Sequence, residues 1–230
     1  MTKDNIDRIL QMVNENSKLS KKEIMEAFCW MILGDGCIEK ADRGNYRLAI
    51  THEASHKDYL YWKASIIEQI TSWSIKDQNK SGGFTPEDGE YLRLRSSAHP
   101  WFTKVYDRFY APLGRKSIDP HALKLLGPLG LAILYQDDGS YYYSNNAGHN
   151  ILIHKLCFSK FELEALAKTI VDKFGIIFRI NRCDNKGLGY RLRMRAKDRD
   201  KFFDLISPYI VPSMLYKVGK GDTLISGDMI

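Results

Sequence analysis

Hydrophobic positions along the chain follow a helical period in some segments and alternate with polar positions in others. In the first half, these segments succeed one another as helix, strand, strand, helix, strand, strand and helix. The segments are Lys22–Gly34, Cys37–Ala41, Tyr46–Glu53, Lys57–Ile70, Ser74–Asn79, Tyr91–Arg95 and His99–Tyr110. We therefore predict the α+β fold class, with an αββαββα unit in this half.

The second half predicts the same order of elements. Its first helix opens at Gly127-Pro128, where proline suits the first helical turn, and Ser159 can cap the second helix. The predicted segments are a helix from Gly127, strands over Gly139–Tyr143 and Asn150–Phe158, a helix from Ser159, strands over Ile176–Cys183 and Gly189–Ala196, and a helix over Lys197–Ile206. The pattern predicts a duplicated unit.

Direct sequence matches between the halves support the duplication. A shift of 100 positions aligns Leu92–Ser96 with Leu192–Ala196, and a shift of 103 aligns Asp35-Gly36 with Asp138-Gly139. A shift of 104 aligns Ile66 with Ile170, so small loop insertions separate the matched segments. We divide the chain into an N-terminal peripheral helix and extension (1–22), a first repeat (23–112), a linker (113–126) and a second repeat with a C-terminal segment (127–230).

The composition is that of a folded protein, with 44% hydrophobic and 27% charged residues among 230. The longest apolar stretch, Leu129–Tyr135, is far shorter than the roughly 18 residues that span a bilayer. The N-terminus mixes acidic and basic residues without an apolar segment, unlike a signal or transit peptide. We therefore expect a soluble protein that is not secreted and has no membrane partner.

Four cysteines, Cys29, Cys37, Cys157 and Cys183, lack the C-x-x-C spacing of common zinc sites. We expect them to be buried, reduced thiols.

A net charge of +6 is by itself a weak indication of a polyanionic partner, but the charge is unevenly distributed. Nine basic and three acidic residues lie between Arg179 and Lys201. In a strand over Tyr190–Ala196, alternation puts three arginines on one face and three apolar residues on the other. The strand over Tyr91–Arg95 has the same design. One such strand is typical of a solvated sheet face, whereas two matching strands favour a surface for an anionic ligand.

The first helix of each repeat is apolar on all sides and ends at an aspartate followed by glycine. These segments read Phe28–Gly36 and Leu131–Gly139, with Asp35 and Asp138 in equivalent places. All-round hydrophobicity implies burial, and small residues (Ala27, Cys29, Gly130 and Ala132) would let the two helices approach closely. Carboxylates about 4 Å apart repel by roughly 4 kcal/mol at an effective dielectric near 20, so the pair would need a shared proton or a cation such as Mg²⁺. The alternative is that each Asp-Gly only ends a helix.

Together, these two helices resemble the paired signature of the LAGLIDADG homing endonucleases in their single-chain, two-repeat form. The resemblance covers nearly the whole chain from about Glu23. The first signature departs from the consensus at Cys29, Trp30, Leu33 and Gly34, and the second carries Asp137 at its penultimate variable position. The repeat, its spacing and the charge pattern make the resemblance more specific than either signature alone.

The resemblance implies two antiparallel sheets that form a saddle over DNA, with the two signature helices packed at the centre. It implies a site-specific endonuclease that makes double-strand breaks with short 3′ overhangs by metal-dependent hydrolysis. Carried over to this sequence, Asp35 and Asp138 would be the catalytic metal ligands, with the carbonyls of Gly34 and Asp137 as lesser contributors. The expected cofactor is Mg²⁺, with Mn²⁺ able to substitute.

Further site residues follow from the resemblance and from the charge pattern. Lys116 and Lys217 would lie at the edge of the active site, although each could instead be an ordinary surface lysine. The candidates for contact with bases or phosphates are Arg47, Thr51, Arg93, Arg95, Arg179, Arg182, Lys186, Arg191, Arg193 and Arg195. Tyr141–Tyr143 would either add to the DNA face or pack in the core.

Three functions remain open for this fold. The first is the endonuclease, a monomer acting on a double-stranded DNA target in the compartment that encodes its mobile intron, whether an organelle or a bacterial or phage-infected cytoplasm. The second is an RNA-binding maturase whose partner is intron RNA. The third is a DNA-binding protein that no longer cuts, which the presence of both Asp35 and Asp138 disfavours.

Overall fold

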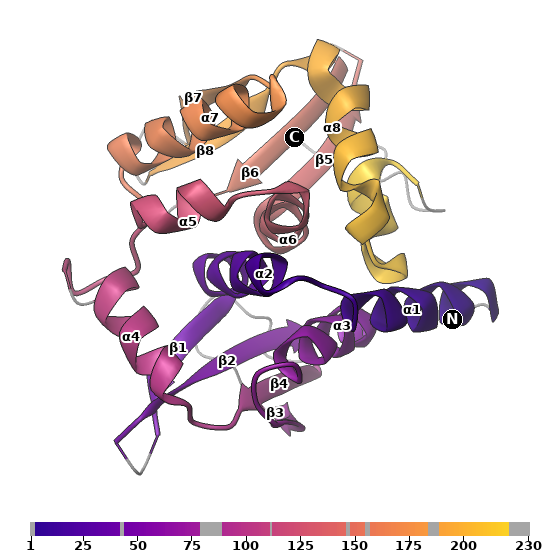
Figure 1. The fold of residues 1–230 in the computed structure, drawn as a ribbon. Coiled ribbons are helices and arrows are strands. Elements are labelled where there is room, and N and C mark those ends of the chain that lie inside the picture. Colours follow the sequence, from indigo (N-terminus) through magenta and orange to yellow (C-terminus); the bar gives the residue numbers. More distant parts are fainter. Residues whose placement is uncertain are drawn as a thin grey trace.

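The computed structural model has the predicted order of elements in both halves of the chain (Figure 1). It describes residues 3–41, 44–78, 89–110, 112–145, 148–154, 157–183 and 189–220. The first half consists of α1 (Lys3–Asn16), α2 (Lys21–Leu33), β1 (Gly36–Lys40), β2 (Tyr46–Glu53), the 3₁₀ helix η1 (Ala54–His56), α3 (Lys57–Ile67), β3 (Trp73–Gln78), β4 (Tyr91–Ser96) and α4 (Pro100–Phe109). After α5 (Pro120–Leu125), the second half consists of α6 (Pro128–Asp138), β5 (Gly139–Ser144), β6 (Gly148–His154), α7 (Lys160–Phe174), β7 (Phe178–Arg182), β8 (Tyr190–Met194), η2 (Ala196–Asp198), α8 (Arg199–Ile206), η3 (Ser207–Tyr209) and η4 (Pro212–Val218). The predicted α+β class and duplicated αββαββα unit are confirmed.

Each half contains one four-stranded antiparallel sheet, in the orders β1-β2-β4-β3 and β5-β6-β8-β7. The register of the first strand pair is also the same in the two sheets. Gly36 lies opposite Ile50 in the first sheet, and Gly139 lies opposite Ile153 in the second. The shift of 103 positions found in the sequence therefore relates equivalent places at the start of both sheets.

Most predicted elements end within about three residues of the observed ones, and two predictions differ by more. Strand β6 ends at His154, so the predicted strand to Phe158 is too long, because the chain must leave the sheet before Ser159 caps α7. The segment 113–126, expected to be a simple linker, contains α5, which begins at Pro120 with the Asp119 side chain as its N-cap.

Helices α2 and α6 lie side by side at the centre of the molecule, between the two halves (Figure 1). Every residue of α2 from Glu26 to Leu33 is buried, and so is every residue of α6 from Leu129 to Gln136. A Cβ atom at Gly130 would overlap the Trp30 ring. The glycine is therefore required for the close approach of the two helices, as the small residues in both segments predict.

Glu26 connects the two central helices at their N-terminal ends. Helix α6 begins after Gly127, which has no side chain to cap it. Instead, Glu26 of α2 accepts hydrogen bonds from the backbone N–H groups of Gly127 and Gly130. Burial raises the pKa of Glu26, while these two hydrogen bonds act in the opposite direction. One half of the molecule thus caps the central helix of the other.

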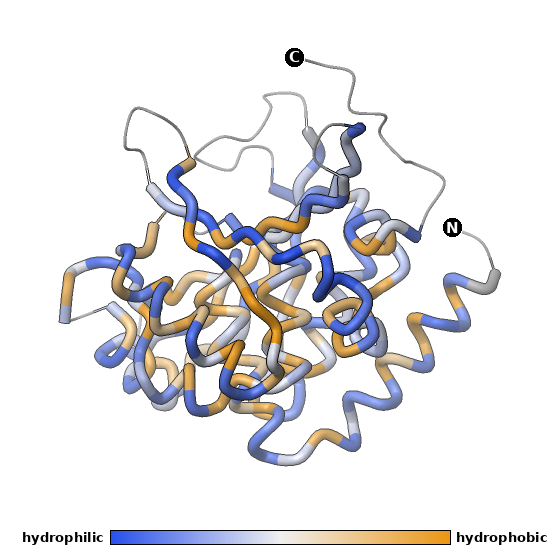
Figure 2. The backbone as a smooth tube through the Cα atoms, turned by 90° about the horizontal axis from the view of Figure 1, so that it is seen from above, coloured by the Kyte–Doolittle hydropathy of each residue, from blue (hydrophilic) through white to orange (hydrophobic). Residues whose placement is uncertain are grey.

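Hydrophobic segments occupy the interior of the chain trace, and hydrophilic segments dominate its margins (Figure 2). No helix within the described ranges is long and apolar enough to cross a membrane. All four cysteines are free, as expected, but they are not uniformly buried: Cys29 is buried and Cys157 is exposed. The expectation of four buried thiols is therefore wrong for Cys157, which lies on the surface three residues before α7 begins.

The connection between the halves is anchored by Glu162 on α7. Its carboxylate accepts hydrogen bonds from Arg115 Nη2 at 2.8 Å and from the Ile118 amide at 3.0 Å, and it completes a capping box with Ser159. Burial alone would raise the pKa of Glu162, but Arg115 and the Ser159 and Ile118 hydrogen bonds lower it to about 2. These hydrogen bonds fix the chain on both sides of Lys116, a predicted site residue.

We predict that Glu162→Gln lowers the free energy of unfolding by about 2 kcal/mol at neutral pH, allowing for the partly exposed arginine. The folded-state pKa lies below the usual 4.5, so this stability is present above pH 4.5 and is lost as the pH falls towards about 2. Denaturant unfolding at several pH values measures the difference between the variant and the wild type. Glu164→Gln, which removes an exposed carboxylate of the same helix, serves as the control. A deficit that stays constant down to the lowest accessible pH would contradict the assignment.

Candidate active site and nucleic-acid interface

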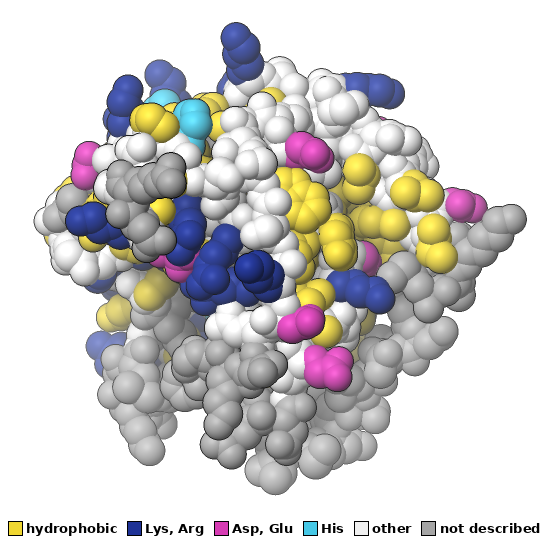
Figure 3. Space-filling model, turned by 90° about the horizontal axis from the view of Figure 1, so that it is seen from below, with side chains coloured by type: hydrophobic (Ala, Val, Ile, Leu, Met, Phe, Trp, Pro, Cys, Tyr) yellow, Lys and Arg dark blue, Asp and Glu magenta, His cyan; other side chains and the backbone are white. Residues whose placement is uncertain are grey.

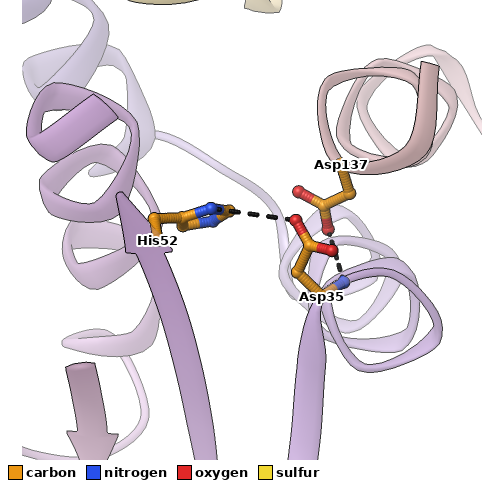
Figure 4. Close-up of side chains that lie close together, drawn as sticks. All are labelled: Asp35, His52 and Asp137. Atoms are coloured by element: carbon orange, nitrogen blue, oxygen red, sulfur yellow. Dashed lines mark hydrogen bonds and ion pairs between the residues drawn. The ribbon is translucent and has the colours of Figure 1, made fainter. Parts of the chain in front are cut away.

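The C-terminal ends of α2 and α6 meet at the centre of the molecule. Gly34 ends α2 and Asp35 follows it, while Asp138 is the last residue of α6. The Asp137 carboxylate of α6 accepts a hydrogen bond from the Asp35 backbone amide at 3.1 Å (Figure 4). Asp35 keeps 37% of its side chain exposed, and Asp138 is half-buried. The two aspartates singled out by the sequence therefore end adjacent helices.

Asp137 is a fully buried carboxylate held by residues of the other half. Its Oδ1 atom accepts hydrogen bonds from Lys63 Nζ at 2.6 Å and from the Tyr59 hydroxyl at 2.8 Å, both on α3. The side chains of Asp137 and Lys63 are both 0% exposed. Burial alone would raise the pKa of Asp137, but Lys63, His52 and Tyr59 hold it below its usual value. The carboxylate is therefore ionised and fully paired.

His52, on β2, lies between this ion pair and Asp35. Its Nε2 atom is 3.1 Å from Lys63 Nζ, and its Nδ1 atom is 3.7 Å from Asp35 Oδ2 (Figure 4). Burial and the nearby lysine lower the pKa of His52 well below its usual value, so the ring is neutral. A lysine ammonium can only donate, which makes Nε2 the acceptor and leaves the ring proton on Nδ1. The N–H edge of His52 therefore faces the Asp35 carboxylate.

Asp35, His52 and Asp137 place one possible metal-ligand atom each within 4.8 Å of one another. Within the described parts of the chain, no other group of three acidic, histidine or cysteine residues does so. Asp138 is not part of this group. Lys63 already occupies Asp137 and His52, so Asp35 is the member that presents its carboxylate to the surface.

The two lysines expected at the edge of the site each reach a central helix end. Lys116 Nζ donates to the carbonyl oxygens of Gly34 and Gly36, both at 2.8 Å. Lys217 Nζ, from η4, donates to the carbonyl of Gln136 at 2.5 Å. Burial lowers the pKa of both amines below the usual value. Lys217 is buried and Lys116 is half-buried, and each donates to the C-terminal end of one central helix, unlike an ordinary surface lysine.

One face of the first sheet carries three of the candidate arginines. Glu39 on β1 binds all of them: Arg47 at 2.7 Å, Arg93 at 2.7 Å and Arg95 at 2.9 Å. Thr51 lies directly opposite Arg93 in the strand register and so shares this face. Lys76 on β3, which was not among the predicted DNA contacts, also lies opposite Arg93. Together with Arg47, Arg93 and Arg95 it lines a hollow in this face. Glu39 therefore holds the three arginines in fixed positions.

A corresponding face of the second sheet carries Arg179, Arg191 and Arg193. Arg179 lies directly opposite Arg193, and both line one hollow with Arg195. Arg193 donates to the Asn150 side chain at 2.6 Å. Among the described residues, no carboxylate forms an ion pair with these three arginines of the second sheet.

The structure does not bring every candidate to these faces. Arg182 lies opposite Tyr190, three positions after Arg179 in the same strand. Because successive side chains of a strand point to opposite faces, Arg182 is on the other side of the second sheet. Lys186 lies outside the described residues. Tyr142 and Tyr143 are exposed, whereas Tyr141 packs against the core. Seen from below, one group of Lys and Arg side chains lies near the middle of the visible face, and others are scattered towards its margins (Figure 3).

Sequence reasoning missed His52, Tyr59, Lys63 and Glu39. Lys63 did leave a signal, because it falls in the buried stripe of α3 together with Tyr59 and Ile66. A charged residue in such a stripe predicts a buried partner. Nothing in the sequence identifies that partner as Asp137, which is 74 positions away.

A family model described as the LAGLIDADG DNA endonuclease family matches residues 25–202. The RecA protein of Mycolicibacterium flavescens is 27% identical over 225 residues, covering 92% of this chain and 49% of that protein. The cytochrome b mRNA maturase bI2 of Saccharomyces cerevisiae is 24% identical over 215 residues, covering 90% of this chain and 50% of that protein. The chain thus spans about half the length of these curated relatives.

Two solved structures have a similar fold. The homing endonuclease I-WcaI bound to its DNA recognition sequence aligns with a TM-score of 0.70 and 22% identity, over 89% of this chain and 90% of that one. A variant of I-DmoI in complex with its target DNA and Mg aligns with a TM-score of 0.52 and 17% identity, over 81% of this chain and 96% of that one. At these identities the likeness shows the shared two-sheet fold.

The departure from the signature at Gly34 has a physical reason in this structure. A Cβ atom at Gly34 would overlap the buried Asp137 carboxylate. We predict that Gly34→Ala lowers the free energy of unfolding by about 1–3 kcal/mol, because Asp137 is held in place by three hydrogen bonds.

The same substitution should cost under about 1 kcal/mol in a Lys63→Met/Asp137→Ala background, where the overlapping carboxylate is gone. Denaturant unfolding of the four proteins measures this coupling. Equal costs in both backgrounds would contradict the steric explanation.

Proposed function

The chain belongs to the LAGLIDADG DNA endonuclease family, and on that premise we propose that it is a monomeric homing endonuclease. It would bind one long double-stranded DNA site, cut one phosphodiester bond in each strand and leave short 3′ overhangs. The observation that carries the proposal is the meeting of two aspartate-bearing helix ends between two sheets, each with an arginine-bearing face.

The arginine faces support recognition of duplex DNA. Guanidinium groups contact phosphates and bind the O6 and N7 atoms of guanine in the major groove. Glu39 holds Arg47, Arg93 and Arg95 in place before DNA arrives, which reduces the side-chain entropy lost on binding. The second face, with Arg179, Arg191 and Arg193, has no ion-paired carboxylate among the described residues, and its positive charge attracts the DNA backbone.

The donor set at the helix ends fits a divalent cation at Asp35. This carboxylate is an oxygen ligand of the kind that Mg²⁺ prefers, and it reaches the surface. The Asp137 carboxylate does not fit, because it is fully buried and paired with Lys63. Asp138 at the other helix end, with the carbonyls of Gly34 and Asp137 as lesser contributors, completes the proposed ligand set. Bound Mg²⁺, or Mn²⁺ in its place, would supply phosphate charge neutralisation and a water of lowered pKa.

Lys116 and Lys217 would support the chemistry from the two sides of the site. Their hydrogen bonds to carbonyl groups fix each Nζ atom beside one helix end. Because burial lowers the pKa of both, each amine can give up a proton more readily than an exposed lysine. Each can orient a water molecule or stabilise the charge that develops on the cleaved phosphate.

A second candidate function is RNA binding in intron splicing. It is favoured by the similarity to the cytochrome b mRNA maturases bI2 of Saccharomyces cerevisiae and Debaryomyces hansenii, the latter 25% identical over 90% of this chain. The same arginine faces would then contact RNA phosphates, and the carboxylates at the helix ends would have no necessary role. Substitution of Asp35 and Asp138 therefore distinguishes the two functions, because it should abolish DNA cleavage and leave RNA binding intact.

We predict that Asp35→Asn and Asp138→Asn each reduce DNA cleavage by at least about 100-fold, because each removes a charged group at the reacting phosphates. DNA affinity should stay within about threefold, since the arginine faces are unchanged. Cleavage of a target duplex in Mg²⁺ and a binding titration with Ca²⁺ measure the two effects. Asp172→Asn, which removes an exposed carboxylate on α7, is the matched control. Full cleavage by both site variants would refute the mechanism.

A further inference from the structure

The polar contacts around Asp35 form a continuous network. Lys63 donates to the Asp137 carboxylate and to His52, and these two residues in turn contact Asp35. Asp137 does so through the Asp35 amide at 3.1 Å, and His52 through the Asp35 carboxylate at 3.7 Å. Tyr59 adds a third hydrogen bond to the Asp137 carboxylate. Both the backbone and the side chain of Asp35 are thus contacted by groups that Lys63 fixes.

Three of the four network positions have a non-polar equivalent in the other half, and the equivalent of His52, Lys155, lies outside the described residues. Gly34 is equivalent to Asp137 by the common sheet register, as Gly36 is to Gly139. Helices α3 and α7 align with a shift of 104, which matches the buried residues Ile66 and Ile170. The same shift puts Leu163 in place of Tyr59 and Ala167 in place of Lys63, and both are buried.

The fold itself therefore does not need the ion pair. The corresponding positions hold Gly34 at the end of α2 and the buried Leu163 and Ala167 on α7, and these cannot form an ion pair. Burying two charges is costly, and replacing a buried ion pair by apolar residues is commonly neutral or stabilising. A network that is dispensable in one copy and intact in the other points to a role at the residue it contacts, which is Asp35.

We propose that Lys63 is a positioning residue for the Asp35 half of the active site, acting through Asp137 and His52. This inference rests on the proposed endonuclease function. The position equivalent to Lys63 in the second half is Ala167, so the two half-sites differ chemically. Cleavage of one DNA strand depends on the network and cleavage of the other does not.

Lys63→Met/Asp137→Ala tests the inference, since it removes both charges together and leaves neither unpaired in the core. The assay uses a target duplex with each strand labelled separately, so that the cleavage rate of each strand is measured. We expect one strand to be cut about 10- to 100-fold more slowly, as misplaced catalytic groups commonly cause, with nicked DNA accumulating. The other strand and the DNA affinity should stay within about threefold of the wild type.

Ile66→Val is the matched control, because it perturbs the same helix at a fully buried position outside the network. It should slow neither strand selectively. Equal rates for the two strands in the double variant, or equal slowing of both, would overturn the inference while leaving the endonuclease function intact. If the wild-type chain cut no DNA, the proposed function would fall and the inference with it.

The histidine ring gives a second readout that does not depend on cleavage. In ¹⁵N-labelled wild-type protein, Nε2 of His52 should be the acceptor and Nδ1 should carry the proton, because Lys63 donates to Nε2. Lys63→Met/Asp137→Ala should remove this preference, and His52→Gln assigns the signal. A wild-type ring with its proton on Nε2 would overturn the inference.

Discussion

The close packing of α2 against α6 is the constraint on which the rest of the structure depends. Both helices are buried over most of their length, and Gly130 is required because Trp30 occupies the space of a side chain. Glu26 ties their N-terminal ends together through the backbone of α6. Once these helices are fixed side by side, their C-terminal ends and the residues that follow them have little freedom.

Everything proposed for the active site follows from that junction. The sheets begin directly after Asp35 and Asp138, so the arginine faces are placed relative to the same two helix ends. Lys116 and Lys217 reach these ends from segments far away in the sequence, and Glu162 anchors the first of these segments. The active site is thus assembled from both halves, although each half has a complete sheet of its own.

The duplication gives two similar half-sites that are not identical. Asp137 extends from α6 into the first half, where Gly34 leaves space and Lys63 supplies the opposite charge. The residues Gly34, Lys63 and Asp137 depend on one another. An alanine at position 34 would collide with the Asp137 carboxylate, and Lys63 without that carboxylate would be a buried, unpaired charge. The presence of this contact makes the first half-site distinct from the second.

The sequence predicted the features that depend on local pattern. The element order, the repeat and the arginines of the two central strands follow from periodicity and direct matches. It missed the Lys63–Asp137 pair, because only the packing of α3 against α6 brings the two residues together. Arg182 was predicted to bind DNA because of its charge, although it lies three positions after Arg179 and is therefore on the other face of the sheet. The helix at Pro120 was missed because two prolines and a glycine suggested a loop. Selection of cut sites from a random duplex library in Mg²⁺ measures whether the two helix ends and the two arginine faces act as one endonuclease site: we expect one long enriched sequence cut in both strands, and a library left uncut, or cut without sequence preference, would contradict the proposed function.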